Sequence, residues 1–268
     1  MAPLSAAAKS RNLLYRVLSG LVLGPVTLAL AFIGDWPFGL ALSAASAVGF
    51  GEWLKMTSGR APWWGYAAPF VVFALYRLIG ADAALIALAV LAALFGAAAP
   101  RNRVLVALGL PYVALTLIAL SWLRDTWNGG WPLVFFVFVV VWATDIGAFF
   151  VGRTVKGPRL APGISPNKTW SGFAGGLALA ALAAIGLMAG ALGASRPVQV
   201  VEIALGLSLL GQGGDLFESA IKRRFGVKDS GDLIPGHGGM LDRIDALLWV
   251  APAFALLHAL GFTSGMTP

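Results

Sequence analysis

The feature that most constrains this chain is a series of apolar runs that are too long for the core of a soluble domain. The runs 17–34 and 133–144 contain no charged side chain. Of the 268 residues, 59% are hydrophobic and 12% are charged, whereas soluble domains have about 25% charged residues. Because such runs would be insoluble if exposed to water, the sequence predicts that lipid is the solvent for much of the chain.

Apolar segments of about 17 to 25 residues indicate helices that cross a membrane. The sequence therefore predicts an all-α polytopic membrane protein with about nine such helices, five in an N-terminal region (1–124) and four in a C-terminal catalytic region (125–268). Arg77 and Asp82 crowd the junction of the third and fourth spans, which could instead form one re-entrant unit. The expected spans are 17–34, 36–56, 63–80, 82–99, 103–123, 131–151, 171–194, 198–221 and 241–262.

The basic residues are unequally distributed between the two ends of these spans. An odd number of spans puts the termini on opposite sides, and the side richer in Lys and Arg is cytoplasmic. We expect a cytoplasmic N-terminus and an external C-terminus in a bacterial inner membrane. The external loops contain only Arg124 and Arg196, and Arg77 and Arg243 lie within or at the edge of spans. The cytoplasmic set is Lys9, Arg11, Arg16, Lys55, Arg60, Arg101, Arg103, Arg153, Lys156, Arg159, Lys168, Lys222, Arg223, Arg224 and Lys228.

Net charge and cysteine content narrow the possible chemistry. A charge of +7 would suggest nucleic acid for a soluble protein, but in a membrane protein the placement of basic residues matters more, so we expect no nucleic-acid partner. The absence of cysteine excludes disulfides, thiolate catalysis and cysteine-based metal sites. The first span could instead be a cleaved signal peptide, but its apolar run exceeds the usual length of about 7 to 15 residues.

Most acidic residues are expected at the same depth as the basic loops. An ionisable group inside a span costs about 2.5 to 3.5 kcal/mol on insertion scales and therefore needs a reason. Only Asp35, Asp82, Asp125 and Glu202 are expected elsewhere. We expect one polar site, open to the cytoplasm, that holds both a cation and an anion, as phosphate chemistry with a metal requires. The acids at that depth are Glu52, Asp145, Asp215, Glu218, Asp229, Asp232, Asp242 and Asp245.

The eighth expected span carries a polar face within an apolar helix. Asp215, Glu218, Ser219 and Lys222 are spaced at i, i+3, i+4 and i+7. At this spacing all four side chains project from the same face of a helix. A polar face in lipid indicates a functional site.

The ninth expected span begins with two carboxylates, Asp242 and Asp245, which are three residues apart. Together with the acids of the eighth span they could converge on a hard cation, and magnesium is usually held by carboxylates, water and substrate phosphates. We therefore predict a Mg²⁺ site, with oxygens enough for a second cation. The alternative is that Asp242 and Asp245 form structural salt bridges with Arg243 or Lys222.

The segment 222–240 between these spans is basic and rich in glycine. Glycines let backbone N–H groups approach a phosphate closely, and the N-terminus of the following helix favours an anion. The loop could hold a triphosphate. The alternatives are that its charge is only a topology signal and that His237 is a hydrogen-bonding residue rather than a catalyst.

The stretch 219–245 resembles the signature of the phosphatidate cytidylyltransferase family, also called CDP-diacylglycerol synthases. Two shorter motifs of that family also occur in the expected order, at 145–153 and 165–170. After Trp170 the family often has Glu or Gln where this chain has Ser171, so no role is assigned there, and the N-terminal half is similar only as hydrophobic spans. The matching residues are Ser219, Lys222, Arg223, Lys228, Asp229, Gly231, Pro235, His237, Gly238, Gly239, Asp242, Arg243 and Asp245.

The resemblance implies a reaction and a set of site residues. It implies CTP and phosphatidate as substrates, pyrophosphate as a product, a divalent metal held by aspartates, and a homodimer. The expected catalytic residues are Asp215, Asp242, Lys222 and Arg243. The expected substrate-binding residues are Ser165, Asn167, Lys168, Thr169, Lys222, Arg223, Lys228, His237, Gly238, Gly239 and Arg243. The expected metal ligands are Asp215 and Asp242, followed by Asp145, Glu218 and Asp245.

Three of these residues, Ser165, Asn167 and Thr169, precede the expected seventh span and could either bind phosphate or cap the helix. Two other classes of protein also remain open. A transporter would need polar groups that continue toward the outer face, where this chain is nearly all apolar. A related CTP-dependent enzyme could act on an isoprenoid alcohol or an archaeal ether-lipid phosphate, but the full signature favours phosphatidate. We expect the pocket between the eighth and ninth spans, open to cytosol and lipid.

Overall fold

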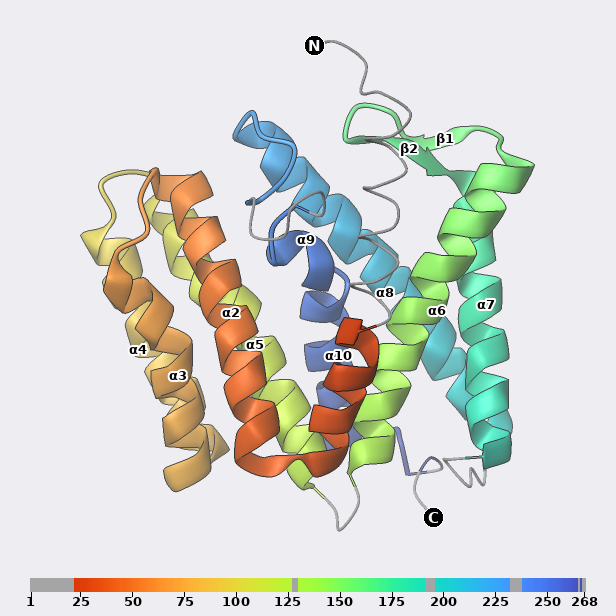
Figure 1. The fold of residues 1–268 in the computed structure, drawn as a ribbon, viewed down its shortest axis with the longest axis horizontal. Coiled ribbons are helices and arrows are strands. Elements are labelled where there is room, and N and C mark those ends of the chain that lie inside the picture. Colours follow the sequence, from red (N-terminus) through yellow and green to blue (C-terminus); the bar gives the residue numbers. More distant parts are fainter. Residues whose placement is uncertain (1–21, 127–129, 191–195, 232–237, 265, 267–268) are drawn as a thin grey trace.

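The computed structural model describes residues 22–126, 130–190, 196–231, 238–264 and 266, and these form a bundle of helices with one small sheet (Figure 1). The helices are α2 Asp35–Ser58, α3 Trp63–Leu78, α4 Ala81–Ala98, α5 Arg103–Asp125, α6 Trp131–Val155, α7 Trp170–Gly190, α8 Pro197–Arg224, α9 Leu241–Ile244 and α10 Leu247–Ala259. A further apolar helix, Val22–Ile33, precedes α2. The strands are β1 Arg159–Ala161 and β2 Ser165–Thr169.

The described helices support the predicted all-α membrane protein. Five of them, α4 to α8, are long and apolar enough to cross a membrane, and they correspond to five of the nine expected spans. Large apolar side chains such as Ile86 and Leu182 are more than 60% exposed on the outside of the bundle. An apolar exterior is unfavourable in water but is the ordinary surface of a protein in lipid. The chain is therefore an integral membrane protein.

The third and fourth expected spans are present as two helices, whereas the ninth differs from its prediction. The third and fourth are separate helices, α3 and α4, which turn at Ile79 and Gly80. The ninth is interrupted, because α9 ends at Ile244 and α10 begins at Leu247. At the break, Asp245 Oδ1 accepts a hydrogen bond from the backbone N–H of Ala246 at 2.7 Å. A side chain that competes for a backbone donor in this way is a known cause of helix breaks.

The segment between α6 and α7 forms an antiparallel hairpin that the sequence did not predict. Arg159 pairs with Thr169 and Ala161 pairs with Ser165. The hairpin leads directly into α7, where Thr169 Oγ1 accepts a hydrogen bond from the backbone N–H of Gly172 at 3.1 Å. Thr169 therefore caps α7, and its expected role in binding phosphate stays a prediction.

The helices α6 and α7 approach each other closely through small residues. A Cβ added to Gly147 of α6 would lie 2.4 Å from the carbonyl oxygen of Gly175 in α7, so neither helix has room for a side chain there. Close backbone approach through small residues is the usual way in which helices pack in lipid. This packing fixes the hairpin, which joins the two helices, at one end of the bundle (Figure 1).

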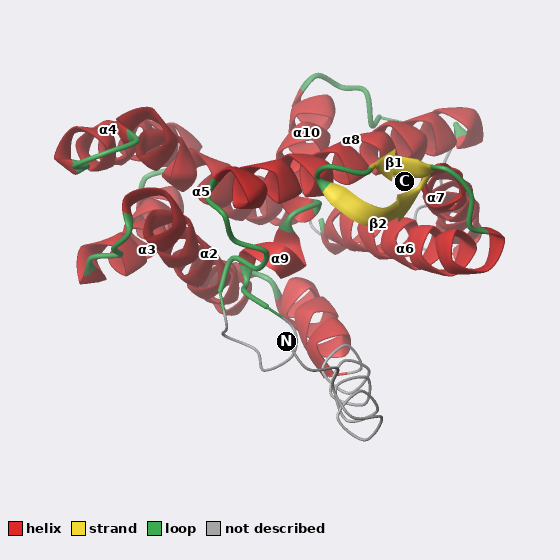
Figure 2. Cartoon of the chain, turned by 90° about the horizontal axis from the view of Figure 1, so that it is seen from above, coloured by secondary structure: helices red, strands yellow, loops and turns green. Residues whose placement is uncertain are grey.

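The short helix α9 lies in the middle of the bundle. Seen from above, it has α2 and α5 on one side and α6, α7 and the hairpin on the other (Figure 2). Leu241 anchors α9, because it is fully buried in a core cluster that includes Phe50 and Trp53 of α2. In Figure 1, α9 lies toward the end of the bundle where α2, α6 and α8 finish and where the hairpin lies. The residues that follow Leu241 are therefore held at the meeting point of these elements.

The opposite end of the bundle is tied together by its own charged residues. Arg77 of α3 forms ion pairs with Asp125 of α5, at 2.7 Å, and with Asp35 at the start of α2. The Tyr76 hydroxyl donates a hydrogen bond to the same Asp125 carboxylate at 2.9 Å. These contacts join the ends of three helices far from α9. The candidate site lies at the other end of the bundle, which contains the hairpin.

Candidate active site

The predicted polar face of α8 is present. Lys222 Nζ lies 3.0 Å from Glu218 Oε1, one turn earlier on the helix. Ser219 Oγ lies 3.5 Å from Asp215 Oδ1 on the same face. Glu218 is fully buried, and its second oxygen, Oε2, has no hydrogen-bond partner within the described residues. The face thus combines a buried cation with two carboxylates and one unsatisfied oxygen.

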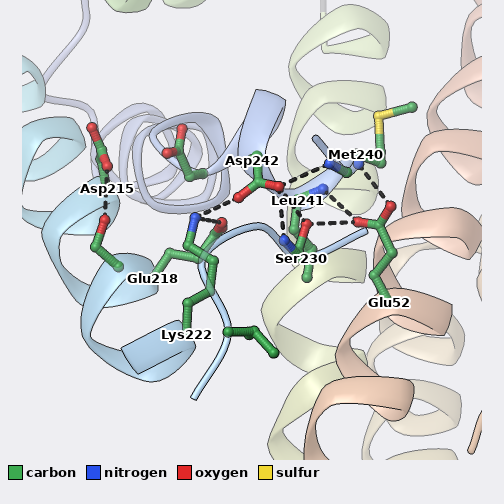
Figure 3. A network of polar contacts seen from close by, with 12 residues as sticks. Glu52, Asp215, Glu218, Lys222, Ser230, Met240, Leu241 and Asp242 are labelled. Atoms are coloured by element: carbon green, nitrogen blue, oxygen red, sulfur yellow. Dashed lines mark hydrogen bonds and ion pairs between the residues drawn. The ribbon is translucent and has the colours of Figure 1, made fainter. Parts of the chain in front are cut away.

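Lys222 also connects α8 to α9. Its Nζ lies 2.5 Å from Asp242 Oδ1, so one ammonium group bridges the carboxylates of Glu218 and Asp242 (Figure 3). The other Asp242 oxygen, Oδ2, accepts hydrogen bonds from Ser230 N at 2.8 Å, Ser230 Oγ at 2.9 Å and Gly239 N at 2.8 Å. Asp242 therefore fixes the loop on both sides of residues 232–237, while its Oδ1 faces α8.

A second carboxylate holds the same loop from the opposite side. Glu52 of α2 accepts hydrogen bonds from Met240 N and Leu241 N, each at 2.9 Å, and from Ser230 Oγ at 3.0 Å (Figure 3). Its side chain is buried, with the whole residue 6% exposed. Ser230 Oγ thus lies within hydrogen-bond distance of both Glu52 and Asp242. A continuous polar chain runs from α2 through the loop and α9 to α8.

The hairpin brings a further cation to the polar face of α8. Lys168 of β2 forms an ion pair with Asp215. Arg223, near the end of α8, donates a hydrogen bond from Nε to the carbonyl oxygen of Ile164 in the hairpin turn, at 3.3 Å. Lys168 and Asp215, which are 47 positions apart in the sequence, are therefore neighbours. The motif at 165–170 and the face of α8 belong to one site.

Two more acids lie within electrostatic range of this cluster. Asp245 interacts with Asp215, Glu218 and Asp145, and Asp145 of α6 interacts with Asp215, Lys168 and Arg243. Among the described residues, however, no three Asp, Glu or His side chains are grouped closely enough to form a ready-made metal site. The site is an array of alternating carboxylates and cations rather than a closed metal cage.

The remaining sequence candidates lie around the rim of this array. On β2, Ser165 is half-buried and Asn167 is exposed; Arg223, Lys228 and Arg243 are also exposed. Gly238 has a φ of 81°, a left-handed conformation that favours glycine. Gly239 is buried, and its N–H donates to Asp242. His237 lies outside the described residues, so its expected role stays a prediction.

Aromatic side chains form an inner wall beside the polar face of α8. Tyr112 of α5, Phe217 of α8 and Trp249 of α10 pack edge to face, with ring centroids 5.3 to 6.5 Å apart. Tyr112 OH and Trp249 Nε1 are buried and, like Glu218 Oε2, have no hydrogen-bond partner among the described residues. Buried polar atoms usually have partners, so three such atoms together mark a place where the folded chain alone leaves hydrogen-bonding capacity unused.

Comparisons with known proteins identify the family of this chain. The family model of the cytidylyltransferase family matches residues 14–260. The chain belongs to the cytidylyltransferase family. It is 42% identical over 258 residues to the phosphatidate cytidylyltransferase of Brucella suis, with 93% of each chain covered. It is 35% identical over 265 residues to that of Bacillus subtilis, covering 91% of this chain and 97% of the relative.

Membership of the cytidylyltransferase family confirms the resemblance drawn from residues 219–245 and extends it. The sequence analysis found only generic similarity in the N-terminal half, whereas the family match begins at residue 14. The expected class of enzyme, a CTP-dependent nucleotidyltransferase, is also confirmed.

Glu52 belongs to the candidate site of this cytidylyltransferase, but the sequence alone assigns it no role there. It was counted among the acids at the cytoplasmic depth but received no role. The available signal was a carboxylate within an otherwise apolar stretch, since Phe50, Trp53 and Leu54 beside it are all core residues. An acid in such a position is costly unless hydrogen-bonded donors surround it. Its donors, Ser230, Met240 and Leu241, lie 178 to 189 positions away in the sequence.

Proposed function

We propose that this cytidylyltransferase makes CDP-diacylglycerol and pyrophosphate, for phospholipid biosynthesis, by direct attack of the phosphatidate phosphate on the α-phosphorus of CTP. Support comes from the family and from relatives named phosphatidate cytidylyltransferase. The single observation that carries the mechanism is the alternation of cations and carboxylates where α8, α9 and the hairpin meet. Lys168 pairs with Asp215, and Lys222 pairs with Glu218 and Asp242.

The oxygen donors of this site fit a magnesium ion. Magnesium is usually held by one or two carboxylates together with water and substrate phosphates, so it needs no closed cage of protein ligands. Glu218 Oε2, buried without a partner among the described residues, is an oxygen still free to serve such an ion. We propose Asp215 and Asp242 as ligands, with Asp145, Glu218 and Asp245 as further candidates and a second cation as a further possibility. Asp242 would contribute Oδ1, because its Oδ2 already accepts from the backbone N–H groups of Ser230 and Gly239 and lies 2.9 Å from the Ser230 hydroxyl.

The protein's own task is to hold two anionic substrates together. When bound, magnesium would neutralise part of the charge on the reacting phosphates. We assign Lys168, Lys222, Arg223 and Arg243 to bind phosphate oxygens, with Lys168 and Lys222 turning from their carboxylate partners toward the substrate. The phosphatidate phosphate is already anionic at neutral pH, so no protein nucleophile is needed, and catalysis consists of positioning and electrostatic stabilisation.

The transfer makes one bond and breaks one. An oxygen of the phosphatidate phosphate bonds to the α-phosphorus of CTP, and the bond from that phosphorus to the bridging oxygen of the β-phosphate breaks. Pyrophosphate leaves with the bonding electron pair. The cations near the end of α8 would stabilise the charge on this leaving group.

The position of the site suits a lipid substrate. The hairpin, the end of α8 and the start of α9 lie toward one end of the bundle (Figure 1). Arg153 and Lys156 at the end of α6, and Arg159 at the start of β1, belong to the same end. We propose that this end faces the cytoplasm of a bacterial inner membrane, that nine spans place the C-terminus outside, and that the enzyme is a homodimer. A pocket between α8 and α10 at headgroup depth avoids lifting acyl chains into water, which costs about 0.8 kcal/mol per methylene.

An assay with labelled CTP in detergent tests the reaction. Label from the α-phosphate should enter a diacylglycerol lipid when phosphatidate and magnesium are present, and EDTA should abolish the transfer. Label transferred from the γ-phosphate would indicate a kinase instead, and no transfer at all would favour transport. An isoprenoid alcohol or an ether-lipid phosphate that replaced phosphatidate with higher turnover would identify a different acceptor.

Replacing the proposed metal ligands tests the mechanism separately. Asp215→Asn and Asp242→Asn should each lower kcat by about 100-fold or more, because a bound metal ion supplies several kcal/mol of charge stabilisation. The matched control is Glu202→Gln, an exposed acid at the other end of α8, which should keep near-normal turnover. Near-normal activity of Asp242→Asn, in protein that remains folded in membranes, would remove the central ligand of this mechanism.

A further inference from the structure

The position of Glu52 points to a role that the activity alone does not explain. Glu52 lies on α2, in the N-terminal half, yet its three hydrogen-bond donors belong to the loop that leads into α9 and to Leu241, the first residue of α9. We propose that Glu52 is a positioning residue of the active site, which holds this loop so that Asp242 faces Lys222. The inference rests on the proposed function, because Glu52 acts on catalysis through Asp242.

Two of the three hydrogen bonds fix the start of α9. The first N–H groups of a helix have no partner within the helix, and Met240, the N-cap residue of α9, makes no side-chain cap. Glu52 supplies the missing acceptors from another helix, one oxygen to Met240 N and the other to Leu241 N. Asp242 is the next residue along the chain. The direction of its side chain is therefore set by a backbone that Glu52 holds.

The third hydrogen bond connects Glu52 to Asp242 through one hydroxyl group. Ser230 Oγ lies 3.0 Å from Glu52 Oε2 and 2.9 Å from Asp242 Oδ2. A hydroxyl has a single proton, so Ser230 donates to one carboxylate at a time. The backbone N–H of Ser230 donates to Asp242 as well, at 2.8 Å. The Glu52 and Asp242 carboxylates therefore lie on either side of one hydroxyl group, and a movement of Glu52 would shift the residue whose backbone N–H also donates to Asp242 Oδ2.

The loop backbone packs closely against the Glu52 carboxylate. A Cβ added to Gly231 would lie 2.6 Å from Glu52 Oε1, and one added to Gly239 would lie 2.5 Å from Glu52 Oε2. Both distances are shorter than ordinary contacts, so glycine at these positions allows the backbone to reach the carboxylate. The loop is held by Glu52 on both sides of residues 232–237.

The contacts of Glu52 explain why this place in the core holds a carboxylate. Among the described residues Glu52 forms no salt bridge, and its donors are two backbone N–H groups and one hydroxyl. An apolar side chain would fill the same space in the core beside Phe50 and Trp53 without the cost of burying a charge. The carboxylate matters because it can accept several hydrogen bonds at once, which an apolar side chain cannot do.

The test is a comparison of Glu52→Gln and Ser43→Ala. Glutamine keeps the shape of glutamate but replaces one acceptor oxygen with an NH₂ donor, which cannot accept from an N–H group. Ser43→Ala is the matched control, because Ser43 is a fully buried polar residue of the same helix whose hydroxyl donates only to Gly39 O of α2. We expect Glu52→Gln to lower kcat by about 10- to 100-fold, as is usual for residues that orient a metal ligand, and the KM for CTP to change less than threefold. Ser43→Ala should retain wild-type kcat.

Hydrogen exchange gives a readout that does not depend on turnover. The Met240 and Leu241 amide hydrogens should be protected in the wild type and should exchange at least ten times faster in Glu52→Gln, while the amides of α10 remain protected. Ser230→Ala, a loop change that leaves the helix core intact, should also lower kcat. The double variant should lose less than the product of the two single losses, because both changes disturb the same network.

Each outcome decides the inference. Glu52→Gln with kcat within twofold of the wild type, or with unchanged exchange at Met240 and Leu241, overturns it. Faster exchange throughout α10 as well would show a general structural role and would also overturn it. If the wild-type enzyme does not form CDP-diacylglycerol, the proposed function fails instead, and the exchange measurement still reports whether Glu52 holds the loop.

Discussion

Lys222 is the cation that connects the two helices of the site. The residue is 7% exposed, and its ammonium group lies between the carboxylates of Glu218 and Asp242. One buried ammonium group is therefore the counter-ion of two carboxylates. Removing one member of a buried ion pair is far more destabilising than the pair is stabilising, because the remaining charge is left without a partner. Before substrate arrives, Lys222 therefore offsets the repulsion between these two carboxylates and holds them close together.

Lys222→Met should therefore damage both stability and activity. We expect a loss of about 3 to 5 kcal/mol in the free energy of unfolding, since two carboxylates lose their counter-ion, and turnover below detection. Arg224→Met, an exposed basic residue two positions further along α8, is the control and should keep activity within twofold. Thermal unfolding in detergent and the CTP assay measure the two effects. A Lys222→Met enzyme with wild-type thermal stability would mean that the ion pairs do not form.

The spacing of residues was enough to predict some of these contacts and not others. Asp215, Glu218 and Lys222 share a face because helix periodicity is local, so the sequence predicted their arrangement before any tertiary contact was known. The pairing of Lys168 with Asp215 and the contacts of Glu52 depend on how distant segments pack. No local pattern contains that information. The position of Asp242 and Asp245 at a span start indicated only that they could converge with the acids of α8, and the family signature supported this.

At the scale of elements, the site depends on how closely α8 approaches α10. A Cβ added to Gly214 would lie 2.3 Å from Trp249 Cδ1, so the indole ring of α10 packs directly on the backbone of α8. The same ring contacts Phe217 and Tyr112, which form the inner wall. Asp215 is adjacent to Gly214 in the chain. The distance between the two helices therefore controls where the carboxylate lies.

Gly214→Ala should separate the two helices and lower activity. Overpacking in a tight interface costs about 1 to 3 kcal/mol, which should appear as a lower thermal midpoint together with reduced turnover. Gly213→Ala is the matched control, because a Cβ at the neighbouring position meets no atom within 4 Å. That change should be neutral or slightly stabilising, as alanine favours helix over glycine by about 1 kcal/mol. Equal effects of the two substitutions would contradict the role of the Trp249 contact.

The elements themselves were predictable to different degrees. Long apolar helices such as α6 matched their expected spans because length and hydropathy are strong signals. The hairpin was missed, since Pro158, Pro162 and Pro166 give its sequence the character of a loop. The break after α9 was missed because Asp245 competes for the Ala246 N–H only in the folded backbone, while the apolar pattern runs on without interruption.

At the scale of the whole molecule, the two ends of the bundle differ in charge. The hairpin end carries exposed basic residues such as Arg153, Lys156 and Arg159, whereas at the opposite end Arg77 is paired with Asp35 and Asp125. Basic residues remain on the cytoplasmic side of a membrane because they resist transfer across it. If the hairpin end is cytoplasmic, CTP reaches the site from the cytosol and phosphatidate reaches it from the inner leaflet.

This orientation can be measured directly, because the chain has no cysteine and every introduced thiol is therefore unique. Gly163→Cys places a thiol in the hairpin turn, where a Cβ meets no atom within 4 Å. Asp82→Cys places one at the exposed start of α4, at the opposite end of the bundle. A membrane-impermeant thiol reagent should label Asp82→Cys but not Gly163→Cys in intact spheroplasts, and the pattern should reverse in inverted vesicles. Labelling of both from one side would contradict the nine-span arrangement, and labelling of Gly163→Cys from outside would place the site on the wrong face for CTP.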